Sequence, residues 1–356
     1  KPYLPVYAEA NWFENGERAT LPDDFYSSRT LVDRLIDFLD RDSGSGGAGE
    51  PPFFAYLAFQ AVHIPVQAPA EFRDRYASTY ADGWEILRQR RYEGAVAAGV
   101  APAGLVPRTM PTTEAWDALA PEAQRYQARR MAVYAGMIEA MDHHIGRLVS
   151  HLDTTGRLED TVFLFLSDNG PEPSDPLEPT SAAMRWFFHR WLAASGYDTD
   201  EARLGERGSY VVIGPSVASA AASPFAWYKF FTGEGGMRVP AIVSGLPTPL
   251  AGGVVHAFTW VTDVVPTLLD LAGVDAGAPG QPAGPAPEGR SLLPLLRGEA
   301  PTIHDPEEPV GYELGGNAAL FRGDFKIVRN RGPLGDGEWH LFDLGRDPAE
   351  SRDLRP

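Results

Sequence analysis

The chain has 356 residues, of which 44% are hydrophobic and 11% aromatic, so it can bury the core of one large domain and a smaller one. Its 48 acidic residues against 31 basic ones give a formal net charge of -17, which repels nucleic acid and anionic membranes at long range, so neither is expected as a partner. An anionic substrate would need locally concentrated positive charge, which a bound divalent cation and one or two lysines would supply.

The sequence contains no cysteine, which excludes a disulfide framework and a thiolate metal site. The absence of cysteine does not determine the cellular compartment of the protein, but it favours the cytoplasm over the periplasm. No apolar run approaches the length of a membrane span. The chain starts at Lys1 without an initiator methionine or the apolar core of a signal peptide, so we expect this end to be cut or processed.

The first half of the chain contains three segments with apolar residues at helical spacing. They cover residues 31–39, 84–98 and 121–152. Ser27 and Ser28 are candidate N-caps for the first helix, and Gly156 marks the end of the last. Between the first two helices, the continuous apolar run at 53–59 predicts a buried strand that leads directly into His63.

The second half begins with another apolar run, at 161–166, which predicts a buried strand ending in Ser-Asp-Asn-Gly. The stretch 171–227 is rich in Pro, Ser and aromatic residues, and we expect an irregular surface excursion there. A third short strand is expected at 239–243 and a helix at 264–271. Strand, helix and strand in this order indicate an α/β sheet with its sites at strand ends.

The C-terminal part has a different character. Pro, Gly and Ala dominate 275–287, which is the composition of a linker. Three short runs beyond it predict a small antiparallel sheet, at 318–321, 325–328 and 339–344. We therefore expect an α/β domain at 1–275, a linker at 276–309 and a small antiparallel sheet subdomain at 310–356.

The adjacent Asp168 and Asn169 are candidate metal ligands. A carboxylate and a carboxamide at the end of a buried strand offer oxygen ligands to a hard cation such as Ca²⁺ or Mg²⁺. The alternative is an ordinary Asp-Asn-Gly turn, because these residues tolerate left-handed conformations. Local sequence leaves both interpretations open.

Two further side chains are candidate substrate ligands. His63 follows a strand and precedes a proline, so it could orient a substrate or donate a proton, although a lone histidine is more often structural. Lys229 precedes a glycine-rich turn, Gly233 to Gly236, where a lysine can reach an anion, although most lysines face solvent.

Taken together, the motifs resemble those of the formylglycine-dependent arylsulfatases, the type I sulfatases of the alkaline phosphatase superfamily. The similar segments follow the family's order along essentially the whole chain: 53–57 with His-Ile-Pro-Val-Gln-Ala-Pro at 63–69, Ser-Asp-Asn-Gly at 167–170, 228–240, 262–273, Gly-Arg-Ser-Leu at 289–292, and 339–344 with Asp-Pro at 347–348. The resemblance implies an alkaline-phosphatase-like fold, with a mixed sheet flanked by helices, and hydrolysis of a small-molecule sulfate monoester.

The resemblance also implies roles for the candidate residues. Asp168 and Asn169 would bind the cation, Ca²⁺ or Mg²⁺, that contacts nucleophile and sulfate. Lys229 would contact the sulfate as a substrate-binding and catalytic residue. His63 would bind the ester and could protonate the leaving oxygen.

Part of the family's site has no counterpart here. The family forms its formylglycine nucleophile from a Cys/Ser-x-Pro-x-Arg motif that lies upstream of the segments matched, together with an Asp-Asp metal pair. The nearest match to the serine form of this motif begins at Ser174, but it lacks the arginine. The nearest match to the metal pair is Asp23 with Asp24, which precedes a predicted helix, so a solvated turn is expected there. We therefore expect the nucleophile on a missing N-terminal segment, which would be a partner of this chain. Two alternatives remain, a phosphonate or phosphate ester hydrolase of the same superfamily and a non-catalytic binding protein.

Overall fold

A computed structural model describes residues 12–42, 52–176, 181–275 and 287–356. The chain forms two compact units, each built from segments far apart in the sequence. The first comprises 1–87, 112–161 and 172–221, and the second 88–111, 162–171 and 222–356. The expected division at 275 and 310 stays a prediction, and residues 276–286 of the expected linker lie outside the described residues.

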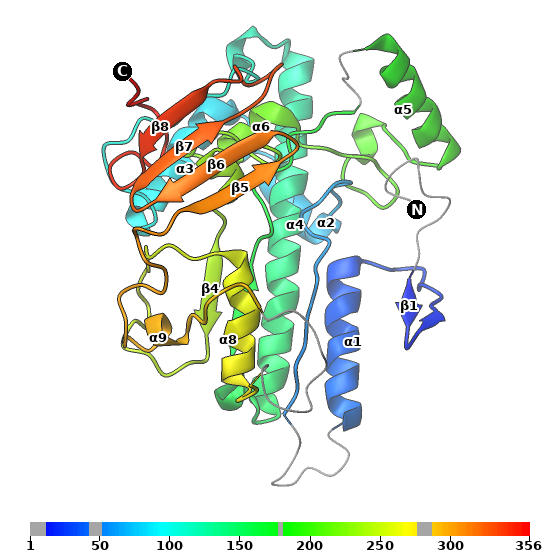
Figure 1. Cartoon of the computed structure of the whole chain (residues 1–356). Helices are drawn as coiled ribbons and strands as arrows, with labels where there is room; N and C mark the ends of the chain where they lie inside the picture. Colours follow the sequence, from blue (N-terminus) through cyan, green and yellow to red (C-terminus); the bar gives the residue numbers. More distant parts are fainter. Residues whose placement is uncertain (1–11, 43–51, 177–180, 276–286) are drawn as a thin grey trace. The chain divides into compact units, whose positions relative to one another are not determined.

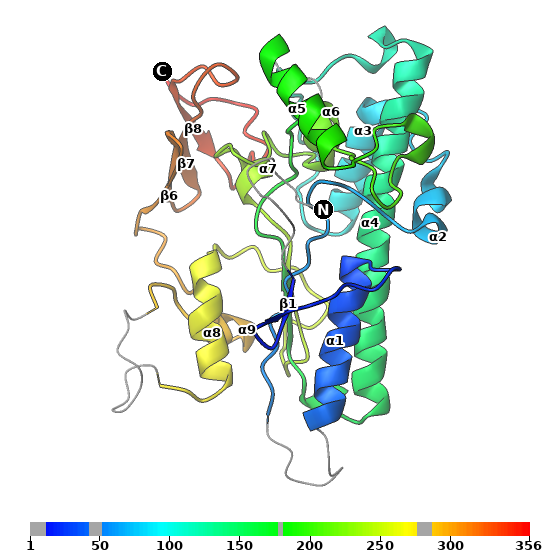
Figure 2. The ribbon, with the colours of Figure 1, turned by 90° about the vertical axis from the view of Figure 1, so that its right-hand side faces the viewer.

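The first unit is mainly helical. Its elements are the hairpin β1 (Phe13–Glu14) and β2 (Glu17–Arg18), and the helices α1 (Ser27–Asp42), α2 (Ala70–Arg73), α4 (Pro121–Thr154), α5 (Ala182–Ala194) and α6 (Gly214–Ala221). Helix α3 (Gly83–Ala97) begins in this unit and continues into the second. Figures 1 and 2 both show α1 alongside α4.

Helix α4 organises the first unit because it buries a continuous stripe. Pro121 lies at the start, where its missing N–H costs nothing. The buried side chains then recur every three or four residues, which places them on one face, as in Val133, Met137, Ala140, His144, Leu148 and Leu152. The predicted helices at 31–39, 84–98 and 121–152 are thus confirmed.

The second unit contains two sheets. Strands β3 (Phe163–Leu166) and β4 (Ala241–Ser244) pair antiparallel. A four-stranded antiparallel sheet follows in sequence order, with β5 (Val310–Leu314), β6 (Asn317–Arg322), β7 (Phe325–Arg329) and β8 (Trp339–Asp343). The helices are α7 (Glu234–Met237), α8 (Val264–Leu271) and α9 (Leu293–Leu296). The C-terminal antiparallel sheet is confirmed, with β5 added to the predicted strands.

One face of the C-terminal sheet carries the core of this part of the chain. Side chains of a strand alternate between its two faces. Accordingly Ala319 and Phe321 of β6 are buried with Val328 of β7 and Phe342 of β8. Aromatic and apolar residues from earlier in the chain, including Trp260, pack against this cluster.

The predicted strand at 53–59 is wrong. This segment is extended but forms no strand, and Phe54 and Tyr56 are 75% and 85% exposed. A buried strand needs backbone partners, and no strand of the described residues pairs with it. The strand at 161–166 forms as β3, but its side chains are half-buried rather than buried.

The prediction of an irregular stretch at 171–227 is also wrong in part, because it contains α5 and α6. Ser181 caps α5 by accepting a hydrogen bond from the Met184 N–H at 3.2 Å. The sequence pattern did not predict α5 because its apolar residues are not confined to a buried face. Trp186 and Phe187 are 63% and 46% exposed.

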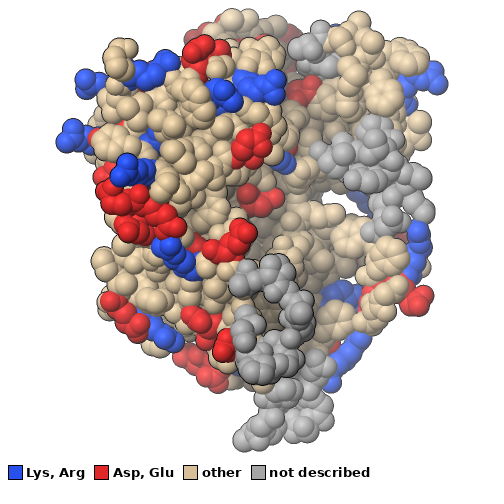
Figure 3. Space-filling model, in the orientation of Figure 1, with Lys and Arg blue, Asp and Glu red and all other residues tan. Residues whose placement is uncertain are grey.

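Charges of both signs share the surface. Figure 3 shows basic side chains among acidic ones on one face. Exposed pairs such as Arg322 with Glu307 at 2.7 Å contribute little to stability because solvent screens them. No helix in the described ranges is both long enough and apolar enough to cross a membrane.

The buried His144 gives a pH test of the first unit. Burial, reinforced by the nearby Arg147 and His143, lowers the pKa of His144 from 6.5 to about 4, so the folded state holds it neutral. The unfolded state takes up its proton first as pH falls, and stability is therefore lost between about pH 6.5 and 4. We expect His144→Gln to reduce the loss of unfolding free energy between pH 7 and pH 5 by about 1 kcal/mol.

Urea unfolding at the two pH values measures this difference. The matched control is His143→Gln, because His143 is exposed on the same helix. Equal pH dependence in both variants would show that His144 is not the group responsible.

Candidate functional site

The turn that follows β3 presents two side chains suited to a hard cation. Asp168 is exposed and Asn169 half-buried. The Ser167 hydroxyl donates to the Asn169 carbonyl at 2.9 Å, which shapes the turn through backbone atoms. Within the described ranges neither the Asp168 carboxylate nor the Asn169 carboxamide has a protein hydrogen-bond partner, so their oxygens are available as ligands.

These two residues fit a cation but do not complete its coordination. Ca²⁺ and Mg²⁺ prefer about six or more oxygen ligands. The described part of the chain holds no group of three or more His, Asp or Glu side chains placed to bind a metal. Asp168 and Asn169 would therefore need further ligands from water or from another part of the protein.

Gly170 ties this turn to α7. A Cβ at position 170 would lie 2.0 Å from the Gly235 carbonyl oxygen, so only glycine permits the approach. The Gly170 N–H donates to the Gly236 carbonyl at 3.0 Å. The position of α7 therefore determines the position of the turn that carries Asp168 and Asn169.

Lys229 is attached to the same region through its backbone. Its N–H donates to the carbonyl of Pro171 at 3.1 Å, directly after the turn. The side chain is half-buried, and its ammonium lies 5.5 Å from the centre of the Phe230 ring. The structure thus brings the segments that carry Asp168, Asn169 and Lys229 together. That their side chains share one site stays a prediction.

The backbone around Lys229 is strained. Trp227 and Phe230 have φ angles of 67° and 78°, which bulky residues rarely adopt. Stacking of Trp227 on Phe231, with ring centres 4.4 Å apart, and full burial of Tyr228 compensate. Backbone strain of this kind collects at functional sites, which supports a role for Lys229.

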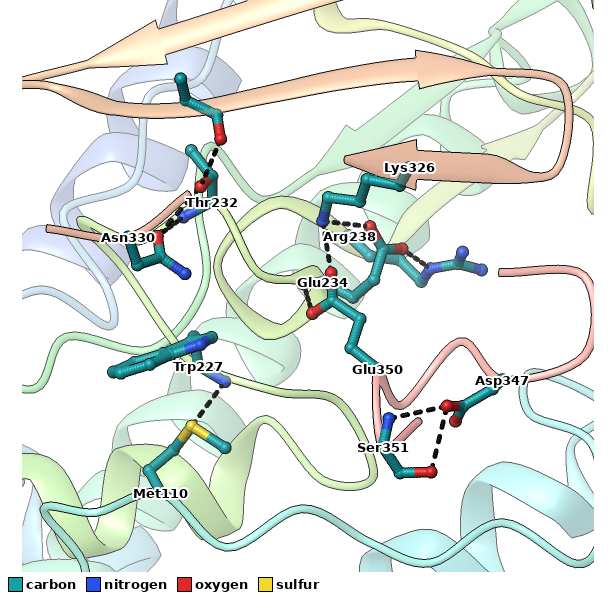
Figure 4. A network of polar contacts seen from close by, with 11 residues as sticks. Met110, Trp227, Thr232, Glu234, Arg238, Lys326, Asn330, Asp347, Glu350 and Ser351 are labelled. Carbon is teal, nitrogen blue, oxygen red and sulfur yellow. Dashed lines mark hydrogen bonds and ion pairs between the residues drawn. The ribbon is translucent and has the colours of Figure 1, made fainter. Parts of the chain in front are cut away.

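Two polar contacts hold the strained loop in place. The Trp227 N–H donates to the sulfur of Met110 at 3.1 Å (Figure 4). The Thr232 N–H donates to the Asn330 carboxamide oxygen at 2.9 Å. The loop is therefore anchored on both sides of Lys229, once to Met110 in the segment between α3 and α4 and once to Asn330, directly after β7.

A buried set of charged groups lies directly after this loop. Figure 4 shows Lys326 of β7 pointing at Glu234 of α7 and at Glu350. The Lys326 ammonium is 2.9 Å from a Glu234 oxygen and 2.8 Å from a Glu350 oxygen, and all three side chains are at most 4% exposed. Arg238 donates to the second Glu234 oxygen at 2.6 Å. Glu350 also accepts the Glu234 backbone N–H at 2.9 Å.

The pKa shifts of this set follow from burial and pairing. Burial acts to lower the pKa of Lys326, but Glu234 and Glu350 outweigh it and raise the pKa above its ordinary value. Burial acts to raise the pKa of Glu234, yet Lys326 and Arg238 hold it below the ordinary value. For Glu350 burial prevails and the pKa is raised. Lys326 and Glu234 are therefore the firmly ionised pair.

His63 belongs to the first unit. It is exposed, and its Nδ1 lies 2.9 Å from the Ile64 carbonyl oxygen. A carbonyl oxygen only accepts, so Nδ1 carries a hydrogen. Gln67 fixes the following segment by donating to the Ser209 carbonyl at 2.6 Å. The meeting of His63 with Asp168 and Lys229 in one pocket stays a prediction.

Sequence reasoning missed the residues that support the site. Glu234 lies in a segment that the motifs included, and Glu350 lies two residues after the Asp-Pro pair at 347–348, but neither was singled out. A charged residue is normally solvated, and sequence spacing does not reveal that Lys326 is fully buried.

Comparison with solved structures identifies the fold. The solved structure of Ps i-CgsB in complex with k-i-k-neocarrahexaose is similar over 97% of this chain and 54% of that one, with a TM-score of 0.58 and 20% identity. This similarity shows the fold, an alkaline-phosphatase-like α/β architecture. The predicted fold class is thus confirmed.

The family is defined by sequence. Residues 3–274 match the family model described as Sulfatase, and the chain belongs to the sulfatase family. It is 33% identical over 344 residues to an uncharacterized sulfatase of Schizosaccharomyces pombe, covering 93% of this chain and 58% of the relative. It is 35% identical over 263 residues to the arylsulfatase of Klebsiella aerogenes, covering 73% and 54%. The chain thus spans little more than half the length of these relatives.

The close approach at Gly170 can be tested by adding one methyl group. We expect Gly170→Ala to lower the unfolding free energy by about 3 kcal/mol, because the Cβ would overlap the Gly235 carbonyl. The control is Gly94→Ala in α3, where a Cβ meets nothing within 4 Å and helix propensity should add about 0.5 to 1 kcal/mol. Urea unfolding compares the two, and a neutral Gly170→Ala would contradict the packing described.

Proposed function

We propose that the protein containing this chain hydrolyses sulfate monoesters, giving an alcohol or phenol and sulfate, and that its substrate is a small-molecule sulfate ester. Family membership supports this reaction. The observation that carries the assignment is the attachment of the Lys229 loop to the Asp168 turn through Pro171 and α7, because one anion and one cation must be held together.

The charges suit a sulfate substrate. Asp168 and Asn169 would hold the divalent cation, Ca²⁺ or Mg²⁺, whose charge supplies neutralisation of the sulfate. Lys229 would donate hydrogen bonds to a sulfate oxygen and add a second positive charge. Together these positive charges reduce the repulsion between the anionic sulfate and an attacking oxygen nucleophile, and so lower the barrier to attack.

His63 would serve the leaving group. Because Nδ1 donates to the Ile64 carbonyl, a proton given to the departing oxygen would come from Nε2. Nε2 carries a proton in addition to that on Nδ1 only when the ring is an imidazolium. The protonated ring is therefore the form of His63 that acts as a general acid.

The nucleophile would come from outside this chain. The formylglycine expected for the family supplies covalent attack when present, and we propose that an N-terminal segment of the same enzyme carries it together with the remaining carboxylate ligands of the cation. A reading frame upstream of Lys1 that encodes Cys/Ser-x-Pro-x-Arg would support this proposal.

Substitutions in the longer enzyme test the assigned roles. Asp168→Ala should abolish cation-dependent hydrolysis of 4-nitrophenyl sulfate, whereas Asp270→Ala, at an exposed position on α8, should leave it unchanged. Rates on a phosphate and a phosphonate ester, measured beside the sulfate ester, identify the preferred substrate. A faster phosphonate or phosphate reaction would overturn the sulfatase assignment.

A second test separates proton donation from binding. His63→Ala should lower kcat about 100-fold or more for alkyl sulfates with basic leaving groups, and much less for 4-nitrophenyl sulfate, because a proton donor matters most when the leaving oxygen is basic. Equal losses for both substrates would show that His63 only positions the sulfate.

The 356-residue chain by itself should show no sulfatase turnover and only weak Ca²⁺ binding. It offers Asp168 and Asn169 as the proposed ligands and has no matched nucleophile motif. Hydrolysis of 4-nitrophenyl sulfate and calorimetric titration with Ca²⁺ measure both properties. Robust turnover after repurification, or tight stoichiometric binding, would show that a complete site exists in this chain.

A further inference from the structure

The buried charges behind α7 connect the C-terminal sheet to the candidate site. Glu234 is the first residue of α7 and makes three polar contacts. Its carboxylate accepts hydrogen bonds from Lys326 and Arg238, and its backbone N–H donates to Glu350. Lys326 comes from β7, and Glu350 from the segment after β8. Figure 4 shows the side chains of Lys326, Arg238 and Glu350 meeting at Glu234.

The other contacts of α7 lead to the proposed ligands. The Gly235 carbonyl lies against Gly170, and the Gly236 carbonyl accepts the Gly170 N–H. The same turn accepts the Lys229 N–H through Pro171. A shift of α7 would therefore be transmitted to the cation turn and to the lysine.

We infer that Glu234, Lys326 and Glu350 are positioning residues that fix α7 and, through it, the spacing between the Asp168 turn and Lys229. The reading of that spacing as a cation and sulfate site rests on the proposed function. The mechanical connection itself does not, because it consists of contacts within the second unit.

Burial makes this connection stiff. A buried charge is tolerated only when every partner is in place, and removing one partner leaves the others desolvated and unpaired. Glu234 therefore has one favourable position, in which all three contacts form. A network that only stabilised the sheet would leave the dynamics of Gly170 and Lys229 unchanged, because the hydrogen bonds of these two amides lead to α7 and to Pro171.

Amide hydrogen exchange in the 356-residue chain tests the connection without any activity. Glu350→Ala removes the acceptor of the Glu234 N–H, and Glu350→Gln retains one acceptor oxygen. We expect the Gly170 and Lys229 amides to exchange about 10-fold faster in Glu350→Ala, with Glu350→Gln between it and the native chain. The control is Leu293→Ala in α9, a buried residue outside this network.

The control separates positioning from lost stability. Leu293→Ala should lower global stability while leaving the exchange of Gly170 and Lys229 unchanged at temperatures where the chain is fully folded. Equal acceleration in both variants would overturn the inference. Should Glu350→Ala fail to fold, Arg238→Gln replaces it, because Arg238 is partly exposed and contacts Glu234 alone in this set.

Kinetics of the longer enzyme provide the second readout. We expect Glu350→Ala to weaken Ca²⁺ binding and lower kcat about 10- to 100-fold, the range typical of residues that orient ligands, while Leu293→Ala changes neither. Unchanged Ca²⁺ binding and kcat in Glu350→Ala would overturn the positioning role. An inactive native enzyme would instead refute the proposed function, and the exchange experiment would still decide the connection.

Discussion

The pairing of Lys326 with two buried carboxylates is the constraint on which the second unit depends. Removing an ammonium from water costs several kcal/mol, and close partners must offset it. Here the partners come from α7 and from the segment after β8, so displacing either one removes one of the two carboxylates that offset the burial of Lys326. The sheet, α7 and the C-terminal segment therefore stabilise one another.

Steric constraints fix the candidate site in the same way as these ion pairs fix α7. Gly170 allows two backbones to approach more closely than any side chain would permit, and the left-handed Trp227 and Phe230 force the Lys229 loop into an unfavourable conformation. Packing of the aromatic rings compensates for that strain. The candidate site is thus built on contacts that tolerate little adjustment, as the proposed binding of an anion would require.

The sequence predicted features with a local cause and missed those with a distant one. The helical spacing in α4 and the turn residues between β6, β7 and β8 act over a few positions, and both were recognised. Whether the run at 53–59 becomes a strand depends on partners elsewhere, and its composition alone was misleading. Asp168, Asn169 and Lys229 stood out as ligand types in family motifs. Lys326 and Glu350 did not, because only the fold makes them buried.

The contact between the Glu234 N–H and Glu350 spans 116 residues of sequence, which has a consequence for biosynthesis. At translation rates of about 5 to 20 residues per second, roughly 6 to 23 seconds separate the two residues as the chain is made. During that interval the Glu234 N–H lacks its acceptor, Glu350. Lys326 is made 92 residues after Glu234 and still lacks one of its two carboxylate partners until Glu350 follows. The loop that carries Lys229 therefore reaches its final form late, and a nascent chain stalled before Glu350 would present it to chaperones and proteases in an unfinished state.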